Sequence, residues 1–252
     1  MLTQPAGAGA PQSTSQHGER SAALNALGEV SPAFLQAYDQ LVTASTVLGP
    51  LPALDRAFIM IALTATPTNL FAPTLRTHIR QALGLGATRE QIVEVFQLVA
   101  ALGLHSCTFG VPVLFDEADK AGAAIALVSD EERAQMKEEF IRIRGYWGDF
   151  WDQVLTLSPA FFAAYLRFSA VPWETAGIAP KIKELIYIAI DSNTTHLYDQ
   201  GLRVHIRNAM RHGASAAEIM QVMQLASTIG MQTFELGMPL LDEEIHRHAA
   251  GR

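Results

Sequence analysis

Two stretches of the sequence, RTHIRQALGLGA at Arg76–Ala87 and RVHIRNAMRHGA at Arg203–Ala214, are copies of one pattern. A constant shift of 127 positions, the separation of His78 and His205, superimposes them. Similarity at a fixed shift over most of a chain indicates an internal repeat, so any function must account for a duplicated histidine helix. The same shift aligns Ser31–Tyr38 with Ser158–Tyr165, and Gly103, Gly110 and Pro112 with Gly230, Gly237 and Pro239.

Helix start and stop signals recur in both copies. Thr88 with Gln91, and Ser215 with Glu218, have the spacing of a capping box. A glycine follows each histidine helix, as expected at a helix C-terminus. The pattern predicts helices over 33–43 and 55–65, the histidine helices, helices from the capping boxes to near Gly103 and Gly230, and last helices beginning near Pro112 and Pro239. With no β-signal of any length, we expect an all-α fold of two homologous helical repeats packed as a pseudo-dimer.

The composition along the chain predicts four segments. Residues 1–20 are rich in Ala, Gly, Pro, Ser, Gln and Thr without an apolar period, which is typical of a disordered tail. We expect a first repeat over 21–118 and a second over 147–252. The charged stretch between them, 119–146, contains DEERAQMKEEFIRIRG and is predicted to be a helical linker.

Bulk properties exclude several classes of protein. The 252 residues are 49% hydrophobic with a net charge of −7, which argues against a nucleic-acid partner. The single cysteine, Cys107, excludes a disulfide within the chain and a CxxC redox pair. The stretch Gln97–Phe115 lacks formal charges, but its Gly, His and Pro residues favour a buried, broken helix over a membrane span. We expect a cytoplasmic protein without membrane contact.

The second histidine helix presents two polar faces. His205 shares one face with Tyr198, while Arg203 lies roughly opposite, four residues after Asp199. His196 precedes Asp199 by three residues and would share the arginine face. The simplest alternative is structural: a buried histidine bonded to a carbonyl group, and arginines in salt bridges.

The two repeats differ in their polar groups. Repeat two has His196, Tyr198 and Asp199 where repeat one has Asn69, Phe71 and Ala72. Conversely, His105 of repeat one corresponds to Gln232. This asymmetry suits either a composite site between the repeats or one functional and one degenerate site. A metal held by His196, His205, His105 and Glu235 is conceivable, but neither HxxxH nor HExxH spacing occurs, so no metal is expected.

The order KELIYIAI at Lys183–Ile190, a histidine helix ending in glycine, GASAAEI and GMPLL resembles the carboxymuconolactone decarboxylase family, which includes the alkylhydroperoxidase D proteins. Both repeats match. The resemblance implies an all-α fold whose units assemble into trimers or hexamers. A tandem chain is similar to a fused dimer of such units, so we expect a homo-oligomer, a trimer of tandem chains.

The resemblance also separates two activities. Peroxidase members use a Glu, a CxxC and the helix His; here Glu184 and His205 match, but Tyr198 and Gly201 occupy the cysteine positions. Thiol peroxidase activity is therefore not expected. The remaining resemblance, to the decarboxylase branch of the family, implies a cofactor-independent decarboxylase. Its substrate would be a carboxymuconolactone-like small organic acid from aromatic-compound catabolism.

Two alternative functions remain open: an isomerase or hydratase acting on a similar acid, and a non-enzymatic, oligomeric ligand-binding protein.

The motifs and the asymmetry between the repeats also predict the site residues. The expected catalytic residues are His205, His196, Glu184 and His105, and the expected substrate-binding residues are Tyr198, Asp199, Arg203 and His78.

Overall fold

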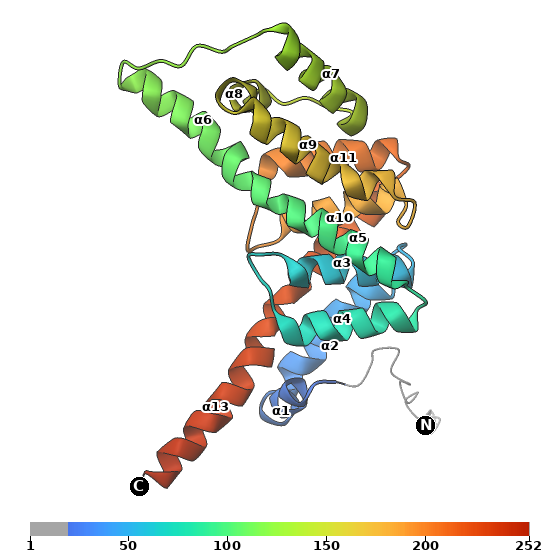
Figure 1. Ribbon diagram of the computed structural model, residues 1–252. Coiled ribbons are helices and arrows are strands. Elements are labelled where there is room, and N and C mark those ends of the chain that lie inside the picture. The colour runs from blue at the N-terminus through green and yellow to red at the C-terminus, as the bar shows by residue number, and fades with distance from the viewer. Residues whose placement is uncertain (1–19, 252) are drawn as a thin grey trace, which may run out of the picture. The chain divides into compact units, whose positions relative to one another are not determined.

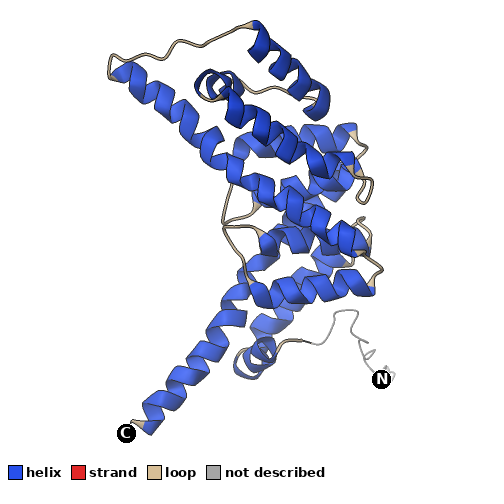
Figure 2. Cartoon of the chain, in the orientation of Figure 1, coloured by secondary structure: helices blue, strands red, loops and turns tan. Residues whose placement is uncertain are grey.

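The computed structural model describes residues 20–251, and in this range the chain consists of helices joined by turns and loops, with no strand (Figures 1 and 2). The expected all-α class is therefore confirmed. The predicted tail lies outside the described residues, except for Arg20.

The helices of the two repeats follow the same order. Repeat one contains α2 (Pro32–Thr46), α3 (Ala53–Ala65), α4 (Ala72–Gly84), α5 (Arg89–Ala100), the 3-10 turn η1 (Ala101–Leu104) and α6 (His105–Lys120). Repeat two contains α9 (Pro159–Glu174), α10 (Pro180–Ser192), α11 (Asp199–Arg211), α12 (Ala216–Ser227), η2 (Thr228–Met231) and α13 (Gln232–Ala250). The remaining helices are α1 (Ala22–Val30), α7 (Glu131–Arg144) and α8 (Phe150–Leu157).

The predicted caps are present. Both capping boxes form, with Thr88 and Ser215 accepting from the backbone N–H groups of Gln91 and Glu218. The glycines after α4 and α11 adopt positive φ angles of 92° and 84°. Residues other than glycine rarely adopt this backbone conformation. Gly86 and Gly213 therefore end the two histidine helices at equivalent places.

The predicted start of the last helix in each repeat is wrong. Pro112 and Pro239 lie inside α6 and α13, which begin at His105 and Gln232. Proline inside a helix removes one backbone hydrogen bond. In α6 the helix nevertheless continues, and Cys107 and Val111 pack against a neighbouring apolar cluster. This packing offsets the lost bond, and it brings His105 into the first turn of a helix.

The core is built from both repeats. Helices α3 and α10 pack against each other and against α5 and α12, and Figure 1 shows α3, α5 and α10 side by side. The hydroxyl groups of Thr68 and Thr195, at equivalent positions, lie 3.0 Å apart. The repeats therefore share one core as a pseudo-dimer. Its fully buried side chains include Ile59, Ile61, Leu63, Leu98, Leu185, Ile186, Ile188 and Val222.

A second apolar cluster anchors the linker. Phe140 of α7, Trp151 of α8 and Phe162 of α9 are fully buried against one another. The predicted linker is thus partly helical: α7 supplies a helix, and residues 123–130 lack regular structure. This packing fixes the end of α7, including Arg144, against repeat two.

Contacts between Cα atoms divide the chain into two compact units, Tyr38–Gln232 and the terminal segments up to Ala37 and from Thr233 onwards. In the terminal unit, the Ser21 hydroxyl donates to Glu235 over 2.7 Å. All residues of the site described below belong to the unit Tyr38–Gln232.

Among the described residues, the stretch Arg89–Lys120 is long and apolar enough to cross a membrane by length and composition. It is broken, as expected, by the turn η1 between α5 and α6. The expected burial is wrong for α6, where only Thr108 is buried and Phe109 is 73% exposed. Its α5 part contributes Ile92, Val95, Leu98 and Val99 to the shared core, so the apolar residues of α5 are accounted for by packing.

Candidate active site

An acid–imidazole pair joins α10 to α11. Oε2 of Glu184 lies 2.6 Å from Nδ1 of His205, and Nδ2 of Asn208 donates to Oε1 over 3.2 Å. The ring of Tyr187 stacks on the imidazole with 4.5 Å between centroids. Glu184 and His205 are both buried. Because a carboxylate accepts, Nδ1 carries the hydrogen and the carboxylate fixes the ring, which leaves Nε2 as the reactive nitrogen.

Asp191 lies on the other side of the imidazole. Its Oδ2 is 3.9 Å from Nε2 of His205 and accepts no hydrogen bond. Burial raises the pKa of this carboxyl group to about 7, although the charge of His205 acts to lower it. A Cβ atom on Gly201 would approach Oδ2 to 2.2 Å and the ring of Tyr198 to 2.6 Å. The absence of a side chain at position 201 therefore allows α11 to lie close to Asp191.

Two more histidines meet at Asp191. Nδ1 of His105 lies 2.6 Å from Nε2 of His196, and each of these nitrogens lies 3.9 Å from Oδ1 of Asp191. Burial, followed by the charges of His196 and His205, lowers the pKa of His105 to about 3. Burial also lowers the pKa of His196. Both rings are therefore predominantly neutral at neutral pH.

The turn before α11 places His196 in this cluster. The backbone N–H of Tyr198 donates to the carbonyl of Asp191 over 2.9 Å, and Leu197 has a φ angle of 48°. Since α11 begins only at Asp199, His196 does not continue the arginine face of the helix. The predicted placement of His196 on that face is wrong, because the chain folds back there.

The site is composite. His105 comes from α6 of repeat one, whereas its neighbours come from repeat two. The ring of Tyr198 lies 4.1 Å from that of His105, between centroids. Burial raises the pKa of Tyr198. One of the two sequence-based possibilities, a site shared between repeats, therefore describes this cluster.

The cation beside the acid–imidazole pair is Arg144 at the end of α7. It donates to the carbonyl of Ser169 over 3.2 Å and lies over the ring of Trp173 at 5.1 Å. Burial alone would lower its pKa. Three tyrosines and Glu184 raise it above its usual value, so the guanidinium stays charged. The tyrosines are Tyr187, Tyr146 and Tyr165.

Two predicted substrate-binding residues lie on the surface instead. Nε of Arg203 donates to Asp199 over 2.8 Å, and the two side chains are 69% and 70% exposed. The structure does not bring them into the cluster. The spacing of four residues on α11 predicted the ion pair between Asp199 and Arg203 correctly. However, His205 lies on the buried side of the helix and Arg203 on the solvent side.

The equivalent place in repeat one lacks an acid. His78 is half-buried, and its Nδ1 lies 3.0 Å from Oε1 of Gln81. Burial lowers the pKa of His78. Ala57 and Thr64 stand where repeat two has Glu184 and Asp191. The predicted residue His78 is therefore outside the cluster, in a copy of the site without its carboxylates.

Five predicted residues meet in space, namely His205, His196, Glu184, His105 and Tyr198. Sequence reasoning missed Asp191, Tyr187, Asn208 and Arg144. Asp191 could have been found, because it follows Glu184 by seven residues on a helix that is otherwise apolar on that side. Arg144 offered no such signal, since it lies in a charged linker.

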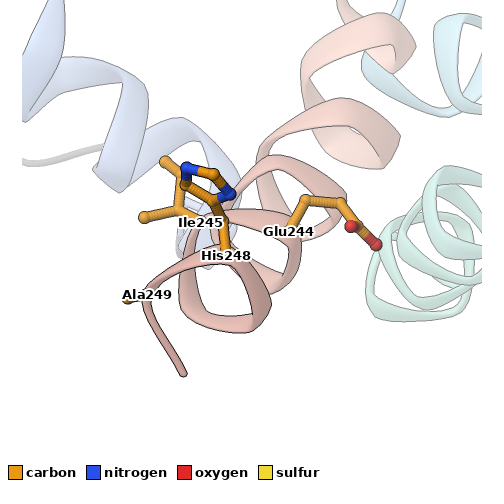
Figure 3. A pocket seen from close by; sticks show the side chains of 4 residues that line it. All are labelled: Glu244, Ile245, His248 and Ala249. Atoms are coloured by element: carbon orange, nitrogen blue, oxygen red, sulfur yellow. The ribbon is translucent and has the colours of Figure 1, made fainter. Parts of the chain in front are cut away.

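A separate surface pocket lies near the C-terminus of α13. It is lined by Glu244, Ile245, His248 and Ala249 (Figure 3). All four belong to the terminal unit, and none takes part in the histidine cluster.

The chemistry available to the cluster is proton transfer. A fixed imidazole with one nitrogen held by a carboxylate is a general acid or base. A carboxyl group with a pKa near 7 is a second proton carrier beside it. The charged, half-buried guanidinium of Arg144 supplies positive charge for an anionic reactant or intermediate.

The model of the carboxymuconolactone decarboxylase family matches residues 32–115 and 159–243. A solved structure from Burkholderia xenovorans LB400, provisionally described as a gamma-carboxymuconolactone decarboxylase subunit, is similar with a TM-score of 0.88 and 42% identity. The alignment covers 92% of this chain and 94% of that one. No curated protein matches. The two matched segments are the two repeats, and the chain belongs to the carboxymuconolactone decarboxylase family.

Proposed function

We propose that this protein is a lyase that decarboxylates a small, carboxymuconolactone-like organic acid formed in the cytoplasm during the breakdown of aromatic compounds. The observation that carries the proposal is the buried pair of Glu184 and His205, 2.6 Å apart. Family membership and the similar Burkholderia protein support the same class of reaction.

The proposed step begins with the substrate carboxylate. Its C–C bond breaks, CO₂ leaves, and the electron pair stays on the remaining carbon skeleton as a dienolate. Nε2 of protonated His205 then donates its proton to carbon, and the ring takes up a proton from solvent before the next turnover. Glu184 stabilises the imidazolium through Nδ1, while Asn208 keeps the carboxylate oriented.

The role assigned to Arg144 is stabilisation of the dienolate. A cation placed on the departing carboxylate would stabilise the ground state and slow the reaction. We therefore assign the guanidinium to the lactone oxygen or to a second carboxylate of the substrate, where negative charge persists or grows. Tyr187, which lies against both the imidazole and the arginine, would separate the two groups.

An isomerase acting on a similar acid is the second candidate. Nε2 of His205 and Oδ2 of Asp191 lie 3.9 Å apart, so one group could remove a proton and the other return it without loss of CO₂. Hydratase chemistry would use the same groups. A non-enzymatic ligand-binding protein would bind the acid and leave it unchanged.

The test is a screen of aromatic-catabolic lactone acids for a rise in melting temperature, followed by measurement of CO₂ and of the product for each acid that binds. The proposal predicts one CO₂ for each acid consumed. Turnover should fall about 10²–10⁴-fold in His205→Gln, the range for a lost general acid. His212→Gln, an exposed position at the end of the same helix, is the matched control and should keep full activity.

Product without CO₂ would instead support the isomerase or hydratase. Binding without turnover of any acid would support the ligand-binding protein.

A further inference from the structure

The cluster of His105, His196 and Asp191 has the composition of a metal site, although neither histidine belongs to a sequence motif for one. Their candidate ligand atoms all lie within 4.8 Å of one another. Two of the residues come from repeat two and the third from repeat one, so only the folded pseudo-dimer brings the set together.

The separations fit a first-row transition metal. Nδ1 of His105 and Nε2 of His196 are 2.6 Å apart, and both lie 3.9 Å from Oδ1 of Asp191. The point equidistant from the corners of this triangle is about 2.1 Å from each atom, which matches the bond lengths of Zn²⁺ to imidazole and carboxylate. Tetrahedral coordination at that length places ligand atoms about 3.4 Å apart. The two nitrogens would therefore move apart by roughly 0.8 Å, and each would approach Oδ1 of Asp191 by roughly 0.5 Å.

The carboxylate of Asp191 supplies the second observation. Its side chain is 1% exposed, and Oδ2 accepts no hydrogen bond. A buried carboxylate normally has a charged partner or several donors. Arg144 is paired elsewhere, through Ser169 and the ring of Trp173. A cation bound to Oδ1, between Asp191 and the two histidines, would neutralise the buried charge of this carboxylate.

We propose that His105, His196 and Asp191 bind one divalent transition-metal ion, of the zinc type, per chain. Two imidazole nitrogens and one carboxylate oxygen select such an ion over Mg²⁺ or Ca²⁺, which prefer oxygen ligands. Three protein ligands leave a fourth position for water or an oxygen of an acid. The second oxygen of Asp191 faces His205 at 3.9 Å, so the ion would lie beside the acid–imidazole pair. This inference stands on geometry and does not rest on the proposed reaction.

The experiment uses the full-length protein, freed of metal with a chelator and titrated with Zn²⁺ by calorimetry. We expect one strong site per chain and a rise in melting temperature on binding. Co²⁺ in place of Zn²⁺ should give the visible absorption bands of low-coordinate cobalt bound to nitrogen and oxygen.

The variants His105→Gln and His196→Gln should each weaken the binding of Zn²⁺ by more than the roughly 100-fold that a lost outer-shell partner costs. Two matched controls should leave affinity unchanged. His78→Gln changes the equivalent histidine helix of repeat one, and His248→Gln tests adventitious binding at the exposed end of α13. Circular dichroism checks that each variant remains folded.

The proposal is overturned if the wild-type protein binds no Zn²⁺. It is also overturned if binding survives unchanged in folded His105→Gln and His196→Gln, or is lost in His248→Gln. Should a histidine variant fail to fold, the Co²⁺ spectrum of the wild-type protein decides, because octahedral, oxygen-only cobalt would contradict imidazole ligation. None of these measurements depends on a substrate or on decarboxylation.

Discussion

The hydroxyl groups of Thr68 and Thr195 lie 3.0 Å apart, and the two residues occupy the same position in the two repeats. Such a contact between equivalent residues marks the pseudo-twofold relationship of the repeats. Close to it, the symmetry of side chains is broken, because Asn69 follows in one copy and His196 in the other. The same backbone is therefore present twice, with acid–base residues gathered around only one copy.

This asymmetry gives different expectations for the two helix histidines. In a turnover assay, His205→Gln should lower the rate about 10²–10⁴-fold while the protein stays folded, because a general acid is lost. His78→Gln should retain most activity, since no carboxylate orients that ring. Turnover and melting temperature are measured together for both variants. Equal losses of activity would indicate paired sites, and a loss that follows melting temperature would assign both histidines to packing.

The buried ion pair between the repeats predicts a large effect on stability. Nζ of Lys183 in α10 lies 2.7 Å from Oε1 of Glu94 in α5, and both side chains are less than 5% exposed. Lys183→Met should cost about 3–5 kcal/mol in the free energy of unfolding, because the glutamate charge is left buried alone. Urea denaturation measures this cost.

The double variant Lys183→Met with Glu94→Gln should recover much of this loss, since no charge then remains buried. Arg56→Met is the matched control, because Arg56 holds the equivalent position in repeat one and only donates to the carbonyl of Leu51 there. Arg56→Met should lower the free energy of unfolding by less than Lys183→Met does. A double variant as unstable as Lys183→Met alone would show that packing, and not charge, sets the cost.

Gly201 and Gly84 form a contrasting pair of helix glycines. In Gly201→Ala, the new Cβ would lie 2.2 Å from Oδ2 of Asp191, so we expect a loss of about 1–3 kcal/mol together with loss of turnover. Gly84 has no atom within 4 Å of such a Cβ. Gly84→Ala should therefore be neutral or stabilise the protein by roughly 0.5–1 kcal/mol. Chemical denaturation of both variants checks this, and an unperturbed Gly201→Ala enzyme would contradict the close packing.

The single cysteine predicts the absence of dithiol chemistry. Cys107 is half-buried, and Tyr198 and Gly201 stand at the positions of the CxxC pair. We expect no turnover of hydroperoxides with a dithiol reductant. Peroxidase activity that disappears in Cys107→Ser would refute this prediction.

Exposed apolar side chains recur at equivalent positions of α6 and α13. Phe109, Val113 and Leu114 are 46–73% exposed, and Leu236, Leu240 and Leu241 are 51–56% exposed. Apolar stripes of this kind are typical of interfaces between subunits. We expect a trimer of tandem chains, with a mass about three times 27.4 kDa by light scattering. A stable monomer at micromolar concentration would exclude it, and Phe109→Glu should weaken the assembly.

The sequence by itself determined the helices, the repeat and the family. Capping boxes, C-terminal glycines and the spacing of apolar residues act within a few residues, so the fold class and most helix boundaries follow from local patterns. Glu184 and His205 could also be named in advance, because each stands at a position of the family motif. The helix start predicted at Pro112 was wrong, because packing along α6 outweighed the local preference of proline for the first turn of a helix.

Only the tertiary structure decided which residues share the site. His105 reaches it from the other repeat, His196 through a turn that interrupts the expected helix face, and Arg144 through the packing of α7 on α8 and α9. Arg203 lies on the same helix as His205 and was an equally good candidate from the sequence, but its side chain lies in solvent. Local spacing tells which residues lie on one side of a helix, but not which side is buried or what meets it there. Those relations are set by the burial of apolar surface between helices distant in sequence.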